Sequence, residues 1–457
     1  MVRPPAAIRE LSGWGQYPRE RCRVFRPEQR GELAAALAAG GDGGLIARGM
    51  GRSYGDEALH ATGAVVLMTR LNRFLALDPV AGVLECEAGV TLAEIIEVAL
   101  PHGLFLPVTP GTKFVTVGGA IANDVHGKNH HRDGSFAGCL QGFDLLTAGG
   151  EVLACSRETH ADAFWATLGG LGLTGVITRA RLRLLRVESA FLAVDYARAA
   201  DLDQAIALFD RHEADYPYSV AWIDCLAPGR ALGRSLLMHA RHASAADARA
   251  AGAADPMRPP PRRVRGVPLE LPGGLLNPLT TRAFNALYYA RPRPAGRLEG
   301  YDAFFYPLDA VEHWNRIYGR RGFVQCQALL PPAGGREALV ALLEKLRAAR
   351  RASFLAVLKR MGPASGGLLS FPGPGWTLAL DMPATADLPG FMDGLHELIL
   401  RHGGRVYLAK DATLRPAHLR AMYPALPRFL EVKRRLDPEG RICSSLARRL
   451  EIAGGAS

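Results

Sequence analysis

The amino-acid sequence predicts an α+β fold in two domains. At 457 residues the chain is too long for one ordinary hydrophobic core, so two or three domains are expected. Residues 41–190 alternate short strand-like runs with glycine turns and a few helices, whereas the residues after about 190 set longer helices between strands. This change of character predicts a domain boundary near residue 190.

Short runs of β-branched and aliphatic residues mark the strands expected in the first domain, at residues 65–68, 83–86 and 152–154. Residues 91–100 are instead predicted to form a helix. Thr91 can cap its first turn, which is acidic, and apolar residues recur at positions 92, 95, 96 and 99.

The second domain is predicted to contain helices at residues 201–210 and 337–350 and strands at residues 354–358 and 376–380. Residues 243–266 are rich in Ala, Pro and Arg, a composition that buries little apolar surface and suits a mobile surface loop. Such a loop can serve as a lid or can simply be disordered, and the sequence leaves both readings open.

The composition indicates a folded chain without a disulfide framework. Hydrophobic residues make up 48% of it, and its seven cysteines are scattered and form no C-x-x-C pair. The N-terminus has a charge and two prolines in place of the apolar core of a signal peptide, and no later run approaches ~18 uninterrupted apolar residues. We therefore expect a cytoplasmic protein.

The net charge of +11 reflects an arginine-rich composition and is usual for a solvated basic surface. It is also compatible with anionic lipid, phosphate or nucleic acid. A basic nucleic-acid-binding protein is a remote alternative supported by charge alone, because no aromatic–basic interleaving, helix-turn-helix or zinc pattern occurs. We expect no nucleic-acid partner.

Two glycine-rich segments, residues 49–56 and 110–131, carry the strongest functional signal. The two phosphates of a dinucleotide are readily neutralised by backbone N–H groups that point inward from a turn, which requires residues without a crowding Cβ. Gly49, Gly51 and Gly55 supply such a turn after a strand-like run. The second segment is dense in Gly, Ala and Asn, so a flat ring or a pyrophosphate could lie against its backbone.

A third stretch, residues 170–175, matches G-x-G-x-x-G by spacing. It follows an apparently helical run, residues 163–168, and no βαβ unit with a ribose-binding acid follows it. We therefore do not interpret it as a Rossmann motif.

Three motifs together carry a family resemblance: G-x-G-R-S-Y-G-D, P-G-T-x-x-V-T-V-G-G-A-I-A-x-D-x-H-G-K-N-H-H and F-W-A-T-x-G-G-x-G-L-T-G. The sequence resembles the vanillyl-alcohol-oxidase type of FAD protein and, within it, most closely the decaprenylphosphoryl-β-D-ribose 2-oxidases. The resemblance covers nearly the whole chain and is weakest at residues 240–300.

The resemblance implies an FAD-binding domain at residues 1–190, an inserted antiparallel-sheet substrate domain at 191–403 and a C-terminal return to the FAD domain at 404–457. The implied reaction oxidises the ribose 2-hydroxyl of a polyprenyl-phosphate-linked sugar to a keto group, the first half of epimerisation to arabinose for cell-envelope glycan. A short-chain reductase would complete the epimerisation. The enzyme would act peripherally at the inner face of the membrane, where the basic residues 258–265 could meet anionic headgroups.

The resemblance also implies which residues bind FAD. Their positions lie in the two glycine segments and two later stretches: Gly49, Met50, Gly51, Arg52, Ser53, Tyr54, Gly111, Thr116, Val117, Gly118, Gly119, Ala122, Asn123, His126, Gly127, Asn129, Gly172, Gly175, Ile177 and Tyr407. Some members of the wider class tether the flavin through a histidine at the position of Arg52. An arginine excludes that bond, so we expect non-covalent FAD.

Lys410 and His126 are the predicted catalytic residues. Lys410 matches the lysine at the flavin edge and would stabilise the developing alkoxide, whereas without the resemblance it could be an ordinary surface lysine. His126 could orient the hydroxyl or relay its proton, or could instead be a histidine that bonds the backbone of a tight turn. His126 and His130 have an i, i+4 spacing, but no Glu lies between them and no third ligand is evident, so we predict no metal.

The substrate cavity is expected to be lined by cations for the phosphate and amides for the hydroxyls. The residues implied are Tyr54, Lys128, Tyr306, Gln325, Gln327, Lys359 and Lys410. Gln325 and Gln327 alternate along a predicted strand, so both should point to one face. Trp222 and Trp376 are interpreted as core residues.

The chain departs from the nearest family pattern at four positions. Thr377 and Ala379 stand where Asn and Cys are usual, and Phe305–Tyr306 stands in place of Tyr–His. These departures bear on the substrate and not on the flavin, and they leave no thiol at position 379. The alternative function is a soluble alditol or aldonolactone oxidase of the same flavoprotein class, which would need no groove for a lipid.

Overall fold

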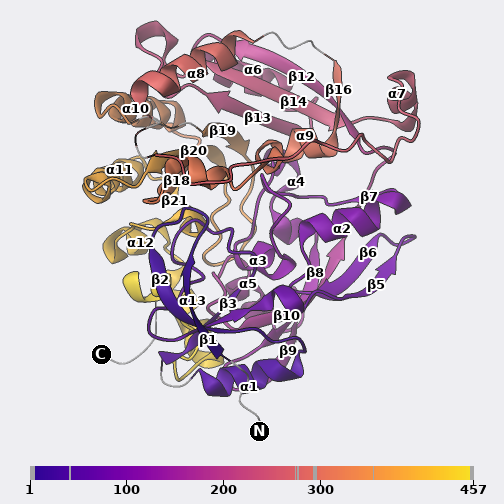
Figure 1. Ribbon diagram of the computed structural model, residues 1–457, viewed down its shortest axis with the longest axis vertical. Helices are drawn as coiled ribbons and strands as arrows, with labels where there is room; N and C mark the ends of the chain where they lie inside the picture. The colour runs from indigo at the N-terminus through magenta and orange to yellow at the C-terminus, as the bar shows by residue number, and fades with distance from the viewer. Residues whose placement is uncertain are drawn as a thin grey trace.

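The computed structural model describes residues 6–40, 43–272, 274, 277–291, 296–351, 353 and 355–452. Figure 1 shows two layered bodies, with the N-terminal third of the chain in the lower one and a large sheet in the upper one. The C-terminal segment runs down beside the N-terminal strands.

The lower body contains two larger sheets and one two-stranded sheet. In the first, the strand order is β1 (Ala6–Ser12), β2 (Arg19–Phe25), β4 (Ala64–Leu67) and β3 (Leu45–Arg48), and β4 pairs in parallel with both β2 and β3. The second is antiparallel, in the order β5 (Phe74–Asp78), β6 (Val83–Glu87), β10 (Val176–Arg183), β8 (Leu140–Leu146) and β9 (Val152–Cys155). Strand β7 (Leu104–Phe105) pairs with β11 (Leu185–Arg186).

The N-terminal part of the chain contributes the following helices to this body: α1 (Gly31–Ala39), α2 (Leu92–Ala99), α3 (Val117–Ala122), α4 (His130–Asp133) and α5 (Ala161–Thr167). Helix α2 confirms the predicted helix, because the Thr91 side chain accepts from the N–H of Glu94 and the Glu94 carboxylate accepts in return from the N–H of Thr91. Residues 170–175 join α5 to β10, so a helix and not a strand precedes the G-x-G-x-x-G spacing, as predicted.

The upper body is built on an eight-stranded antiparallel sheet, which confirms the predicted α+β class. Its strand order is β16 (Arg297–Gly300), β12 (Phe191–Ala199), β14 (Ser235–His242), β13 (Tyr218–Ile223), β19 (Ala356–Met361), β20 (Gly375–Pro383), β18 (Phe323–Leu330) and β21 (Arg405–Val406). The predicted strand at 354–358 corresponds to β19, and Phe354 lies outside the described residues. Helices α6 (Leu202–His212), α10 (Gly335–Ala348) and α11 (Leu388–Arg401) contact strands of this sheet.

Residues 243–266, expected to be a mobile loop, contain regular structure. Helix α7 (Ala245–Ala250) begins with a capping box between Ser244 and Asp247, and β15 (Arg265–Gly266) pairs in parallel with β17 (Val311–Glu312). The Arg262 guanidinium donates to the carbonyl oxygens of Asp302 and Tyr306, at either end of the short helix α9 (Tyr301–Phe305). Movement of this segment stays a prediction.

The C-terminal segment returns to the lower body through α12 (Pro416–Met422), α13 (Leu426–Leu436) and α14 (Ser445–Arg449). Ile442 forms a parallel bridge with Leu45 of β3, and α13 contacts α5. One hydrophobic cluster contains buried side chains from both bodies, among them Ile46 below and Leu378 above. The domain boundaries at residues 190 and 403 stay predictions.

Two further findings concern the chain as a whole. All seven cysteines are buried and free. Among the described residues, no helix combines the length and apolarity needed to cross a membrane.

Candidate active site

A cavity of about 600 Å³ is lined by residues of both bodies. The lower body contributes the glycine segments, including residues 47–54 and 109–112, and the upper body contributes residues of β13, β18, β19 and β20. The 3₁₀ turn Leu408–Lys410, which follows β21, adds Ala409 and Lys410. The cavity therefore combines three separate parts of the chain.

Glycines fix the first segment against its neighbours. A Cβ on Gly49 would collide with the Thr116 side chain, and a Cβ on Gly55 would collide with the carbonyl oxygen of Asp411. Gly51 has a φ of +65°, which L side chains rarely adopt. These contacts explain why the loop is rich in glycine and why it lies against both the second segment and the C-terminal return.

The first segment presents free donors to the cavity. Within the described part of the chain, the backbone N–H groups of Met50, Gly51, Arg52 and Ser53 donate to no protein acceptor, and all four residues line the cavity. Successive backbone N–H groups in a turn form a concavity that binds anions. The arrangement therefore fits the pyrophosphate of a dinucleotide.

The second segment supplies a wall of small residues. The N–H of Gly118 donates to the carbonyl oxygen of Ala88 at 2.8 Å, and the Thr116 hydroxyl accepts from the N–H of Gly119, which docks α3 beside the cavity. Gly118, Gly119 and Ala122 line the cavity, and a Cβ on Gly111 would meet open space. A flat ring can therefore approach this backbone closely.

Lys410 lies in the cavity wall beside Tyr54. Its Nζ atom lies 3.7 Å from the centre of the Tyr54 ring. Burial lowers the pKa of the Lys410 ammonium to about 7, although the carboxyl groups of Asp381 and Glu57 act in the opposite direction. A lysine with this pKa can both accept and donate a proton near neutral pH.

His126 is held by a side-chain network that sequence reasoning did not anticipate. The Gln327 amide nitrogen lies 3.0 Å from Nε2 of His126 and donates to the Thr377 hydroxyl at 3.1 Å. With Nε2 as acceptor, the imidazole proton resides on Nδ1, which is buried without a partner. Burial, aided by Lys359, holds the pKa of His126 well below its usual range, so the ring is neutral.

Two buried carboxyl groups are associated with this site: Glu57 lines the cavity, whereas Asp381 does not line it but accepts a hydrogen bond from Gln325, which does. Burial raises the pKa of Glu57 to about 7 against a hydrogen bond from Asn123, and it raises the pKa of Asp381 to about 7 against one from Gln325. Asp381 lies two residues beyond Ala379 on β20, and residues two apart on a strand share one face. This alternation could have indicated from the sequence that Asp381 lies on the same side as Ala379. Glu57 follows the first glycine motif directly, and nothing in the sequence indicates its burial.

Two more lysines, both half-buried, line the cavity. Burial lowers the pKa of Lys128 to about 7 and that of Lys359 to about 8. The Lys128 ammonium lies 4.1 Å from the centre of the Phe304 ring and donates to the Phe304 carbonyl oxygen. Both lysines line the cavity together with Gln325 and Gln327. The structure thus brings the predicted cations and amides to one place.

An aromatic and aliphatic wall continues the cavity. Trp222, interpreted from the sequence as a core residue, lines it, and its ring centre lies 4.8 Å from that of Tyr288 in α8 (Pro278–Ala290). Phe284 and Met238 line the same region. Trp222 is buried, as predicted, and it also lines the cavity, because β13 pairs with β19 across a long sequence separation that the sequence does not reveal. Trp376 packs against Phe209 and does not line the cavity.

Three expected site residues, Val117, Asn129 and Tyr306, do not line the cavity. The N–H of Val117 donates to the carbonyl oxygen of Val90, and its side chain is fully buried. Asn129 donates to the carbonyl oxygen of Pro107 and to Asp133. The Tyr306 hydroxyl is bonded to that of Thr109 at 2.6 Å. Of these partners, only Thr109 lines the cavity.

The remaining expected residues line the cavity. These are Gly49, Met50, Gly51, Arg52, Ser53, Tyr54, Gly111, Thr116, Gly118, Gly119, Ala122, Asn123, His126, Gly127, Lys128, Gly172, Gly175, Ile177, Gln325, Gln327, Lys359, Tyr407 and Lys410. Phe305 and Ala379, two of the departures from the family pattern, also line it, whereas Thr377 acts through Gln327.

Comparison with known proteins adds two family matches. Residues 23–156 match the family described as FAD binding domain, and residues 380–450 match the family described as D-arabinono-1,4-lactone oxidase. The first match contains both glycine segments. The second contains Tyr407, Lys410 and Asp381.

Individual relatives match over most or part of the chain. The chain is 37% identical to decaprenylphosphoryl-beta-D-ribose oxidase of Mycolicibacterium smegmatis over 454 residues, which cover 98% of each protein. It is 40% identical to an uncharacterized protein of Streptomyces coelicolor over 79% of this chain and 100% of that protein. Cytokinin dehydrogenase 7 of Oryza sativa is 31% identical over 37% of this chain and 34% of its own length.

Proposed function

The chain belongs to the decaprenylphosphoryl-β-D-ribose oxidase family and is an FAD-dependent oxidoreductase, and from this premise we propose that it oxidises the 2-hydroxyl of a ribose carried on a polyprenyl phosphate. The product would be the 2-keto sugar, which a short-chain reductase would reduce to the arabinose epimer. The observation that carries the proposal is one cavity in which unpaired backbone N–H groups, half-buried lysines and buried amides meet.

FAD would lie along the two glycine segments. The free N–H groups of residues 50–53 would bind its pyrophosphate, and Gly118, Gly119 and Ala122 would leave room for its ring. When bound, FAD supplies a hydride acceptor for the carbinol carbon. The Arg52 guanidinium lies 4.0 Å from the centre of the Trp14 ring and offers no nucleophile, so the binding would be non-covalent.

The proton of the oxidised hydroxyl would pass to Lys410. Its pKa of about 7 leaves a neutral amine available to accept a proton near neutral pH. The ammonium formed would stabilise the negative charge that develops on the alkoxide oxygen of the substrate. The Nδ1–H of His126 has no protein partner and would orient the hydroxyl. Gln327 would hold the imidazole in that tautomer through its bond to Nε2.

The phosphate and the lipid would occupy the upper part of the cavity. Lys128 and Lys359 would neutralise the phosphodiester, while Gln325 and Gln327 would bind sugar hydroxyls. The apolar wall of Trp222, Met238, Phe284 and Tyr288 would accept the first isoprene units.

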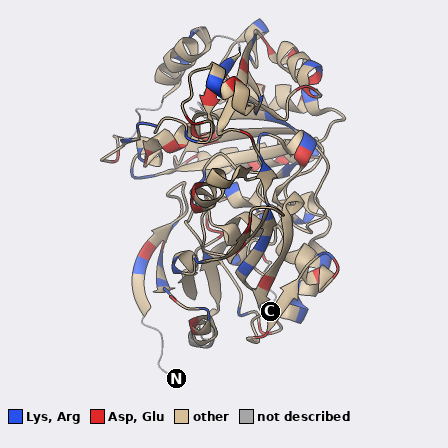
Figure 2. Cartoon of the chain, turned by 90° about the vertical axis from the view of Figure 1, so that its right-hand side faces the viewer, with Lys and Arg blue, Asp and Glu red and all other residues tan. Residues whose placement is uncertain are grey.

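Peripheral membrane contact is part of the same proposal. Arg263 and Arg265 are exposed on either side of Val264, which is 51% exposed, and Leu269 is 74% exposed. Basic residues beside exposed apolar side chains suit an anionic lipid surface. Elsewhere Figure 2 shows Lys and Arg spread over the chain and interleaved with Asp and Glu, an arrangement that does not favour the nucleic-acid alternative.

The competing function is a soluble alditol or aldonolactone oxidase. It is favoured by the match of residues 380–450 to the D-arabinono-1,4-lactone oxidase family, and this stretch contains Lys410. Such an enzyme would not need Lys128, Lys359 or the apolar wall for a lipid phosphate. The two functions therefore differ in the substrate that reduces the bound flavin.

Anaerobic titration of the FAD-loaded protein separates them. We expect a polyprenyl-phosphoryl ribose to bleach the visible flavin band and free alditols or aldonolactones to leave it unchanged. Bleaching by the free sugars alone would overturn the proposal in favour of the soluble oxidase. Sedimentation with anionic and with neutral vesicles would test the membrane contact separately.

A further inference from the structure

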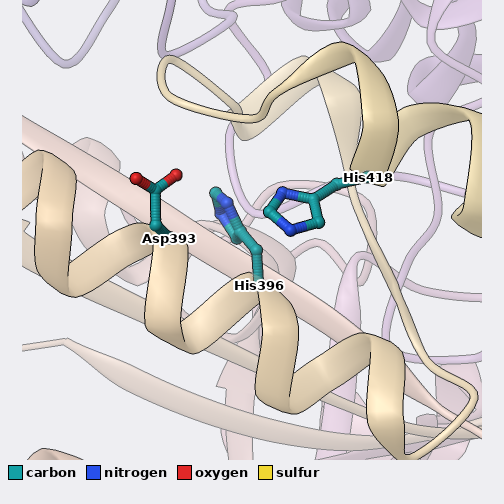
Figure 3. Close-up of side chains that lie close together, drawn as sticks. All are labelled: Asp393, His396 and His418. Carbon is teal, nitrogen blue, oxygen red and sulfur yellow. The ribbon is translucent and has the colours of Figure 1, made fainter.

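We propose that Asp393, His396 and His418 form a binding site for a divalent transition-metal ion such as Zn²⁺, separate from the cavity. Each residue offers one ligand atom, and the three atoms all lie within 4.8 Å of one another. Figure 3 shows the carboxylate and the two imidazoles side by side, with Asp393 and His396 rising from the same helix. None of the three residues lines the cavity described above.

The two supporting helices create this arrangement. Asp393 and His396 are three residues apart on α11, so their side chains share one face of the helix. His418 lies on α12, which contacts α11, and its ring centre is 5.9 Å from that of His396. A metal ion here would therefore link two helices that are separate in the sequence.

His396 provides independent support for a missing ligand. It is fully buried, and neither of its ring nitrogens has a hydrogen-bond partner. The Nδ1 atom of His418 is also buried without a partner. Buried polar atoms are almost always hydrogen-bonded. Each neutral imidazole carries one nitrogen lone pair, so two imidazoles with unpartnered nitrogens beside one carboxylate call for a group that accepts one lone pair from each ring.

The ligand chemistry selects the class of ion. Two imidazoles and one carboxylate suit Zn²⁺ and the neighbouring transition metals, whereas Ca²⁺ and Mg²⁺ prefer oxygen ligands throughout. Three protein ligands leave a fourth position for water. The Asp393 side chain is 17% exposed, so an ion can enter from its side of the cluster.

Arg415 competes for the same carboxylate. Its guanidinium donates to one oxygen of Asp393, and its side chain is 63% exposed. A metal ion must either use the other carboxylate oxygen or displace this arginine into solvent. Removal of the Arg415 guanidinium should therefore strengthen metal binding. If Asp393 served only to pair with Arg415, the same change would have no effect on metal binding.

The test is equilibrium dialysis of the tag-free, FAD-loaded protein against buffered Zn²⁺ after treatment with a chelator, with bound metal measured by mass spectrometry. The variants are Asp393→Asn, His418→Ala and Arg415→Gln, and the matched control is His102→Ala, at an exposed histidine. His396 is left intact because its full burial makes it the position most sensitive to folding.

We expect one Zn²⁺ per wild-type chain. Binding should weaken by roughly tenfold or more in Asp393→Asn and His418→Ala, as is usual when a metal site loses supporting groups. It should tighten in Arg415→Gln and stay unchanged in His102→Ala. Zinc should also raise the melting temperature of the wild type and not that of His418→Ala. Equal binding by the wild type, Asp393→Asn and His418→Ala, or no zinc uptake by the wild type, would overturn the proposal.

Discussion

The Nζ atom of Lys410 lies 3.7 Å from the centre of the Tyr54 ring, although the two residues come from opposite ends of the chain. The N–H of Tyr54 also donates to the carbonyl oxygen of Ala409 at 2.9 Å. The first glycine segment and the C-terminal return therefore position each other. An ammonium over an aromatic ring is stabilised, which partly offsets the loss of hydration on burial.

Replacement of Lys410 should remove the reaction without removing the cofactor. In Lys410→Met we expect anaerobic flavin reduction to slow by about 10²–10⁴-fold, the range for a positioned acid–base group, with normal FAD content. Lys345→Met, on α10 outside the cavity, is the matched control. A rate within about twofold of wild type for Lys410→Met would show that another group accepts the proton.

The pH dependence should separate chemistry from substrate binding. The neutral amine of Lys410 is the accepting form, so the flavin-reduction rate at saturating substrate should rise as pH rises through about 7 and then level off. Lys128 binds phosphate as a cation, so affinity should fall as pH rises through its pKa of about 7. Stopped-flow reduction across pH and substrate concentration measures both trends. A rate that falls as pH rises would contradict the role of Lys410.

Glu57 should make the protein less stable at higher pH. Its pKa is about 7 in the folded state and 4.5 in the reference state, so the folded state binds the extra proton between these values. The contribution of Glu57 to the free energy of unfolding is fully present below about pH 4.5. It decreases by up to about 3 kcal/mol as the pH rises toward 7.

The variant Glu57→Gln removes that loss. We expect its free energy of unfolding to exceed that of the wild type at pH 8 and to match it near pH 4.5, as measured by urea denaturation. Glu158→Gln, at an exposed position, controls for the change in net charge. Parallel pH profiles for the wild type and Glu57→Gln would show that Glu57 titrates normally.

Arg449 should be essential for attachment of the C-terminal return. Its guanidinium forms two hydrogen bonds with the carboxylate of Asp56, at 2.7 and 2.8 Å, and a third with Asp411 at 2.9 Å. Both carboxylates are buried. Arg449→Ala would leave them unpaired, so we expect a loss of about 3–5 kcal/mol in the free energy of unfolding. Arg434→Ala, at an exposed position of α13, should change it by less than about 0.5 kcal/mol.

Local patterns in the sequence predicted the elements that local contacts determine. The Thr91 and Glu94 capping box predicted α2, and the alternation of Gln325 and Gln327 predicted that both face one side of β18, where both line the cavity. The capping box at Ser244 was an equally good signal for α7, but the proline and arginine content around it favoured a loop.

The parts of the site that the sequence did not reveal depend on long-range packing. Trp222 lines the cavity because β13 pairs with β19, more than a hundred residues away. Glu57 becomes a buried acid only when Asn123 and Lys410 close around it. His396 and His418 meet because α11 and α12 pack together, a contact that spacing in the sequence does not show.

A cysteine at position 379 should be reachable from the cavity. Ala379 lines the cavity, whereas the seven native cysteines are all buried and Ala356, on the neighbouring strand β19, is buried away from it. We expect a small thiol reagent to add one label to Ala379→Cys and none to the wild type or to Ala356→Cys, as measured by intact mass. Substrate should protect Ala379→Cys from the reagent, because the label and the sugar would occupy the same space. Labelling of the wild type would show that a native thiol opens to solvent, and equal labelling of both cysteine variants would show that β20 does not present Ala379 to the cavity.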